Sequence, residues 1–95
     1  MADVAIDERR VAHIFRDADG HFHDDTPANR QALIGVASRE RNFVGTDHFG
    51  NDWFAELRDD GTQLWTRVRA GKITNGGVNP TPRYFDLAGR RTRRE

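Results

Sequence analysis

Histidine and arginine are the residue types of this chain that could move protons or hold phosphate. His13 stands where an apolar helical pattern meets a polar loop. Because imidazole titrates near neutral pH, His13 could act as a general base or acid, although a lone histidine more often has a core or capping role. Arg30 lies one turn into a predicted helix whose first amides attract phosphate, but it could instead pair with Asp24 or Asp25.

A second set of polar side chains alternates along a predicted strand at 62–70. The positions that share one face of this strand are Gln63, Trp65, Arg67 and Arg69. An aromatic ring between guanidinium groups is suited to stacking on the bases of single-stranded RNA. The opposite interpretation, with Trp65 packed inward and the arginines solvated, stays open because Trp65 is the largest apolar group of the strand.

The segment Asn75-Gly76-Gly77-Val78-Asn79 is the most unusual stretch of the sequence. Its two glycines would let the backbone approach a ligand closely, and its amide side chains offer hydrogen-bond donors and acceptors. A tight connection between two strands is the simpler interpretation.

A metal site is a weaker alternative. His21 and His23 flank one residue, so in an extended segment both rings would point the same way, as metal ligands do. His48 is a further candidate ligand, but none stands at a motif spacing. A metal-dependent nuclease that uses these three histidines is therefore kept as an alternative.

Composition limits the other possibilities. The 95 residues form one domain over 1–89 with a basic tail at 90–95, and the absence of cysteine excludes disulfides, thiolate zinc sites and cysteine nucleophiles. No apolar run is long enough to span a bilayer. Residues 1–60 hold 13 acidic and 7 basic residues, whereas residues 61–95 hold 2 and 8. This asymmetry points to a nucleic acid or an acidic partner.

The pattern of apolar residues predicts the elements that position these side chains. Residues 2–12 read as a first helix, 13–15 as its last turn or a short strand, and 17–25 as a polar loop. Thr26-Pro27 opens a second helix that ends near 39–41. The expected strands are 53–58, 62–70 and 73–75, with a hairpin turn at 59–61, a rigid loop at 76–82 and an edge strand at 83–86. The predicted fold is α+β, with two N-terminal helices packed on a three- to four-stranded antiparallel sheet.

Several short blocks along the chain together resemble a known group of proteins. The blocks are His13-Ile14-Phe15, Gly20-His21, Asp25 to Arg30, Gly50 to Trp53, Gly61 to Arg69, Asn75 to Asn79, and Pro82. Over residues 13–85 the chain resembles the C-terminal toxin domains of bacterial polymorphic toxins of the contact-dependent inhibition type. That group is associated with the barnase–EndoU–colicin–RelE (BECR) class of small ribonucleases.

The resemblance implies a BECR-like fold and a metal-independent endoribonuclease without a cofactor. Such an enzyme cleaves RNA, here expected to be tRNA, by attack of the ribose 2′-hydroxyl on the neighbouring phosphate. The implied partners of this monomer are the RNA substrate and a cognate immunity protein. The implied place of action is the bacterial cytoplasm, with delivery from another cell as part of a larger effector as one route.

On this resemblance, His13 would be the general base or acid and Arg30 or Arg67 the phosphate clamp. Gln63 and Asn75 would supply hydrogen bonds, and Trp65 would be a base platform. The remaining residues expected to bind nucleic acid are Arg69, Lys72 and Asn79. A non-catalytic module that binds nucleic acid or protein with the same strand face is the main alternative.

Overall fold

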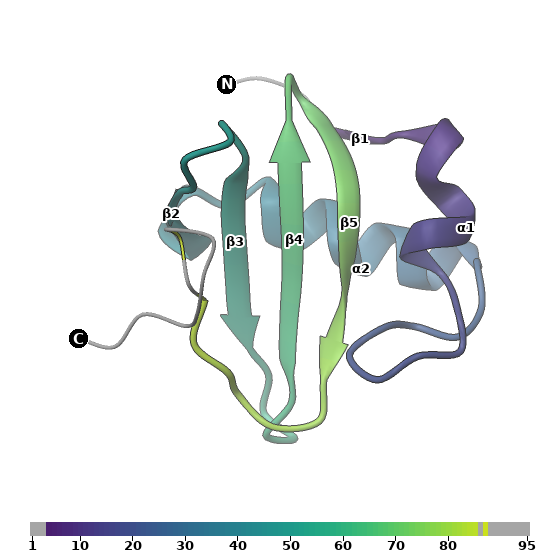
Figure 1. The fold of residues 1–95 in the computed structure, drawn as a ribbon. Helices are drawn as coiled ribbons and strands as arrows, with labels where there is room; N and C mark the ends of the chain where they lie inside the picture. The colour runs from purple at the N-terminus through teal and green to yellow at the C-terminus, as the bar shows by residue number, and fades with distance from the viewer. Residues whose placement is uncertain (1–3, 86, 88–95) are drawn as a thin grey trace.

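One mixed sheet organises the residues that the computed structural model describes, 4–85 and 87. Along the chain the elements are β1 (Ala5–Ile6), η1 (Glu8–Arg10), α1 (Val11–Ile14), α2 (Pro27–Ala37), η2 (Glu40–Asn42), β2 (Phe43–Thr46), β3 (Asp52–Leu57), β4 (Gln63–Arg69) and β5 (Lys72–Asn79). The strand order is β1-β5-β4-β3-β2; β1 is parallel to β5 and every other neighbouring pair is antiparallel. Figure 1 shows α2 crossing behind the sheet and α1 standing beside β5. The α+β class is therefore confirmed, with a larger and mixed sheet.

The α2 helix forms where the sequence predicts it and covers one face of the sheet. Thr26 is its N-cap, with the side-chain hydroxyl accepting a hydrogen bond from the Asn29 amide at 3.1 Å, and Pro27 begins the helix. Leu33 and Val36 are fully buried on the inner side of α2. The core cluster consists of Ile6, Ile14, Phe15, Leu33, Ala37, Val68 and Ile73. Among the described residues no helix is both long and apolar enough to cross a membrane.

The predicted first helix at 2–12 is wrong for the described residues. Ala5–Ile6 is instead a short strand whose ends bond to β5, through the Ala5 amide to the Gly71 carbonyl and the Asp7 amide to the Ile73 carbonyl. This pairing buries Ile6, and the Asp7 side chain then caps the turn η1. The helical spacing of apolar residues did not lead to a helix here because Ala5 and Ile6 pair with an edge of β5 instead. His13 belongs to the last turn of a short helix, as one of the two expectations had it.

Two expectations for the second half of the chain also need correction. The predicted loop at 76–82 is strand up to Asn79, and Phe43–Thr46 forms an additional edge strand. The expected strand at 83–86 is absent over 83–85, and residue 86 lies outside the described residues, as does the predicted tail at 90–95. The hairpin turn at 59–61 is confirmed, with Gly61 at φ +88°.

The strand β5 contains two glycines where two other parts of the chain pack closely against it, one on each face of the sheet. A methyl group on Gly76 would meet Leu33 of α2 and the Trp65 carbonyl, whereas one on Gly77 would collide with the backbone of Gly20 and His21. Gly77 is therefore the point at which the loop 16–25 lies directly on the sheet, on the face opposite α2.

We predict that Gly77→Ala destabilises the protein by about 1–3 kcal/mol, because the added methyl group must displace loop backbone. Gly35→Ala is the matched control. Its methyl group meets only the movable end of Arg39, and the helix gains up to about 1 kcal/mol from the lost glycine. Urea unfolding of both variants measures the difference, and equal stabilities would refute the close contact at Gly77.

Candidate active site

Hydrogen bonds at both ring nitrogens hold His21 in one tautomer. Nδ1 lies 2.9 Å from the Ile14 carbonyl oxygen, which can only accept a hydrogen bond, so Nδ1 carries the proton. Nε2 lies 3.1 Å from Nη2 of Arg16, which can only donate, so in this arrangement Nε2 accepts. The ring also stands edge-on to Trp65, with 5.6 Å between centroids. The loop 16–25 thus presents a neutral, oriented imidazole.

His13 lies half-buried in α1 beside β5, and its ring has no hydrogen-bond partner among the described residues. Burial lowers the pKa of His13, and the positive charges of Arg16 and Arg67 lower it further. Smaller effects come from His21 and Arg10, so all four groups lie within electrostatic reach of this ring. His13 is therefore neutral and available to accept a proton at neutral pH.

Arg67 projects from β4 on the face opposite α2. Its Nε donates to the Thr74 hydroxyl at 3.1 Å, across an irregularity in the pairing of β4 with β5. Burial, followed by the charge of Arg10, lowers its pKa, but an arginine remains a cation at neutral pH. No carboxylate among the described residues forms an ion pair with it. Asn75 stands opposite Arg67 in register, with its side-chain oxygen accepting from the Gly76 amide at 3.0 Å.

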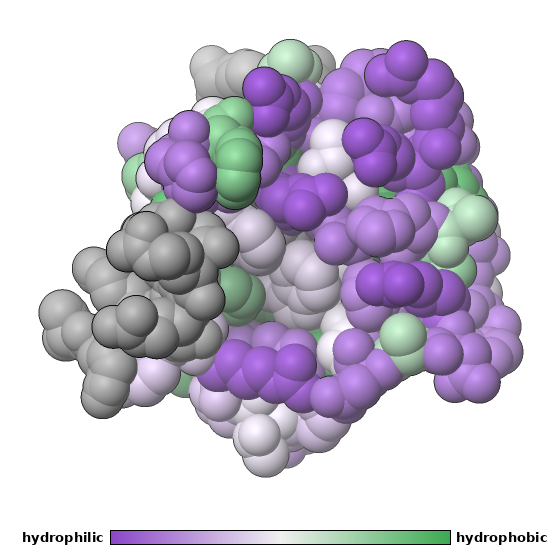
Figure 2. Space-filling view, viewed as in Figure 1, coloured by the Kyte–Doolittle hydropathy of each residue, from purple (hydrophilic) through white to green (hydrophobic). Residues whose placement is uncertain are grey.

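These residues form one group, which we name the histidine–arginine cluster: Arg10, His13, Arg16, His21 and Arg67. Figure 2 shows the face of the molecule opposite α2, where hydrophilic side chains surround a paler hollow. Two imidazoles beside unpaired cations can exchange protons and stabilise negative charge on a phosphate. The cluster is therefore the candidate active site.

Trp65 lies under this surface and has no open ring face. It is only 8% exposed, its Nε1 donates to the Gly20 carbonyl at 2.9 Å, and it stacks on Trp53 with 5.9 Å between centroids. The role of base platform predicted for Trp65 is incompatible with this burial. Its indole instead supports the loop that carries His21.

Asp47 fixes the orientation of the Trp53 side chain, a contact that the sequence pattern does not predict. The buried carboxylate accepts hydrogen bonds from the Trp53 indole and from the amides of Phe49 and Asn51, all at 2.9 Å. Burial alone would raise the pKa of Asp47, but these hydrogen bonds lower it to about 2. The turn between β2 and β3 thus holds the tryptophan pair in place.

Arg30 does not belong to the cluster. Its guanidinium binds Asp25 at 2.6 Å and Glu8 at 2.7 Å, and these hydrogen bonds lower the pKa of both carboxyl groups. The alternative pairing with Asp25 is therefore the one observed. With two carboxylates bound, Arg30 ties the N-terminal segment to α2 and is unsuited to clamp phosphate.

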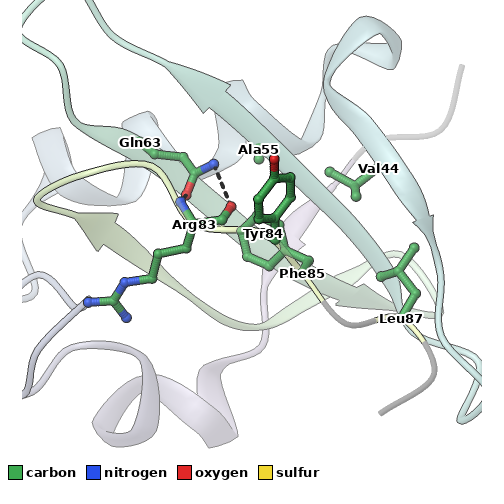
Figure 3. Close-up of a pocket in the computed structure, with 7 residues that line it drawn as sticks. All are labelled: Val44, Ala55, Gln63, Arg83, Tyr84, Phe85 and Leu87. Atoms are coloured by element: carbon green, nitrogen blue, oxygen red, sulfur yellow. Dashed lines mark hydrogen bonds between the residues drawn. The ribbon is translucent and has the colours of Figure 1, made fainter. Parts of the chain in front are cut away.

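Gln63 and Asn79 have a structural role at the end of β4 and β5. Both are buried, and the Asn79 amide donates to the Gln63 side-chain oxygen at 2.8 Å. Gln63 also bonds to both backbone groups of Arg83, accepting at 3.0 Å and donating at 3.2 Å. Figure 3 shows this pairing at the edge of a pocket lined by Tyr84 and Phe85. The two amides are buried, and Gln63 holds the backbone of Arg83, so neither amide is exposed to a substrate.

Arg69 and Lys72 flank the turn between β4 and β5, apart from the two tryptophans. Arg69 donates to the Phe49 carbonyl at 2.8 Å, and Lys72 is exposed. Both remain available to an anion because neither forms an ion pair with a described carboxylate.

The histidines of the metal alternative are not brought together. His23 is exposed and bonds to Asp24 at 2.8 Å, while His48 packs on Phe49 in the turn after β2. Within residues 4–85 and 87, no three His, Asp or Glu side chains lie close enough to hold a metal ion.

Arg10 and Arg16 were missed as candidate residues. A signal for them exists, because Arg10, His13 and Arg16 recur at intervals of three, the spacing that places side chains on one side of a helical segment. His21 was considered only as a metal ligand.

No protein-family model, curated protein or solved structure matches the chain.

We predict that Arg67→Gln raises the pKa of His13, since removal of a nearby positive charge favours the protonated ring. An NMR pH titration of the histidine ring protons measures this change, with Arg41→Gln, an exposed cation of η2, as the control. The pKa of His13 should rise only in the Arg67 variant. An unchanged value would show that the two side chains are not neighbours.

Proposed function

We propose that the protein is a metal-independent endoribonuclease that cleaves RNA through its own 2′-hydroxyl. The observation that carries this proposal is the histidine–arginine cluster, in which His13 lies within electrostatic reach of His21 and of three arginines, and His21 contacts one of them, Arg16. Side chains that shuttle protons near fixed positive charge are what phosphoryl transfer to a neighbouring hydroxyl requires.

In this mechanism His13, the neutral imidazole, takes the proton from the 2′-hydroxyl. The 2′-oxygen forms a bond to phosphorus while the bond from phosphorus to the 5′-oxygen breaks. His21, protonated at Nε2 once Arg16 turns to the phosphate, gives its proton to the leaving oxygen. Arg67 stabilises the charge on the pentacovalent phosphorane. The products are a 2′,3′-cyclic phosphate and a 5′-hydroxyl.

The toxin setting forms part of the proposal. It is supported by the motif resemblance over residues 13–85 and by the α+β class of the fold. On this basis we propose a BECR-like domain that acts on tRNA in the bacterial cytoplasm. We also propose a cognate immunity protein that covers the cluster, where acidic side chains would complement the unpaired arginines.

One contact favours a second candidate, a non-catalytic RNA-binding module. The hydrogen bond from Arg16 occupies Nε2 of His21, the atom that the mechanism needs for proton transfer. A module that keeps this bond would bind phosphate through its arginines without cutting the strand.

Cleavage of total tRNA in EDTA distinguishes the two candidates. We expect fragments that end in cyclic phosphate, and His13→Ala should slow their formation by about 10²–10⁴-fold because a proton acceptor is lost. His23→Ala is the matched control, since this exposed ring lies outside the cluster and should leave the rate unchanged.

Binding that weakens with salt but produces no fragments would establish the second candidate instead. Equal activity of His13→Ala and the parent would remove His13 from the mechanism. Cleavage that appears only with added divalent metal would refute the metal-independent reaction.

A further inference from the structure

A second pocket opens beside the cluster, between η1 and the turn that joins β4 to β5. Its volume is about 430 Å³, large enough for a phosphate group with its ribose. Four cationic residues are among those that line it: Arg9, Arg10, Arg69 and Lys72.

Among the described residues, cations outnumber acidic side chains in this pocket. Asp7 is the one acidic residue of the described lining, and its carboxylate accepts hydrogen bonds from Arg9, from the backbone amide at 3.1 Å and from Nε at 3.4 Å. Arg69 donates to the neutral carbonyl of Phe49, and this contact does not neutralise its positive charge as a carboxylate would. Four cations with a single carboxylate attract an anion.

The pocket is continuous with the histidine–arginine cluster. Arg10 lines the pocket and also acts electrostatically on His13. Thr74 lines it too, and its hydroxyl accepts the hydrogen bond from Arg67 at 3.1 Å. If one phosphate of an RNA strand lies at Arg67, the next phosphate of the same strand would therefore lie in this pocket.

We infer that the pocket between Arg9, Arg69 and Lys72 binds a second phosphate of the same RNA strand, adjacent to the one that is attacked. This inference rests on the proposed function. It assigns a substrate class, because a strand with at least two phosphates fills both sites whereas a dinucleoside monophosphate fills only one.

The test compares two substrates, a dinucleoside monophosphate and the same dinucleotide extended by one nucleotide on each side. The parent protein should cleave the extended substrate with the higher kcat/KM. Lys72→Gln should reduce this preference about three- to fivefold, the usual size of one exposed charge contact. Lys72→Arg should restore it, and Arg41→Gln, a matched charge loss away from the pocket, should leave it unchanged.

A preference that is the same in the parent and in Lys72→Gln would overturn the inference. So would an equal loss on both substrates, because it would indicate a general electrostatic effect.

If the parent protein cleaves neither short substrate, the pocket is judged by binding of a 2′-deoxy trinucleotide. A lack of tRNA cleavage as well would refute the ribonuclease proposal. Weaker binding by Lys72→Gln, with a salt dependence shallower by about 0.7 in log–log slope, would support the pocket. Unchanged binding would refute it.

Discussion

The contact between the loop 16–25 and the sheet is the constraint on which the rest of the structure depends. The Trp65 indole donates to the Gly20 carbonyl, and Gly77 leaves room for that backbone because it lacks a side chain. His21 follows directly and is oriented by the carbonyl of Ile14. This single layer of backbone over β4 and β5 brings the imidazole of His21 within electrostatic reach of His13 in α1. The largest aromatic side chain of the strand thus serves to position the site.

Two sets of arginines within the described residues have different physical roles. Arg30, Arg39 and Arg83 reach carboxylates and tie segments together. Arg10 and Arg67 lack such partners among the described residues, and they lie near a half-buried imidazole whose pKa they lower. Like charges gathered without compensation cost stability, and such perturbed groups concentrate at functional sites. An anionic ligand would relieve this repulsion, and this supports the phosphate-bearing substrate that we propose.

Local signals in the sequence predicted the elements that depend on local chemistry. The Thr26-Pro27 start of α2 and the turn ending at Gly61 hold. The strand β4 also forms where it is predicted, although both faces of its first half are buried. The errors come from long-range contacts that no short window contains. Ile6 pairs with β5 and so leaves its helical pattern, while Gly76 and Gly77 extend a strand because α2 and the loop press on both sides. For the candidate site, the sequence predicts one strand face shared by Trp65 and Arg67, but the burial of Trp65 and the pairing of Arg30 with Asp25 depend on tertiary contacts.

The most direct test of a shared imidazole site is an NMR titration of the four histidine rings with a nucleoside 3′-monophosphate. We expect saturable shifts of the His13 and His21 ring resonances with a common dissociation constant. His23 and His48, which lie outside the cluster, should not move with that constant. Shifts of similar size in all four rings, or a response of His13 without His21, would contradict the claim that the two imidazoles act on one phosphate.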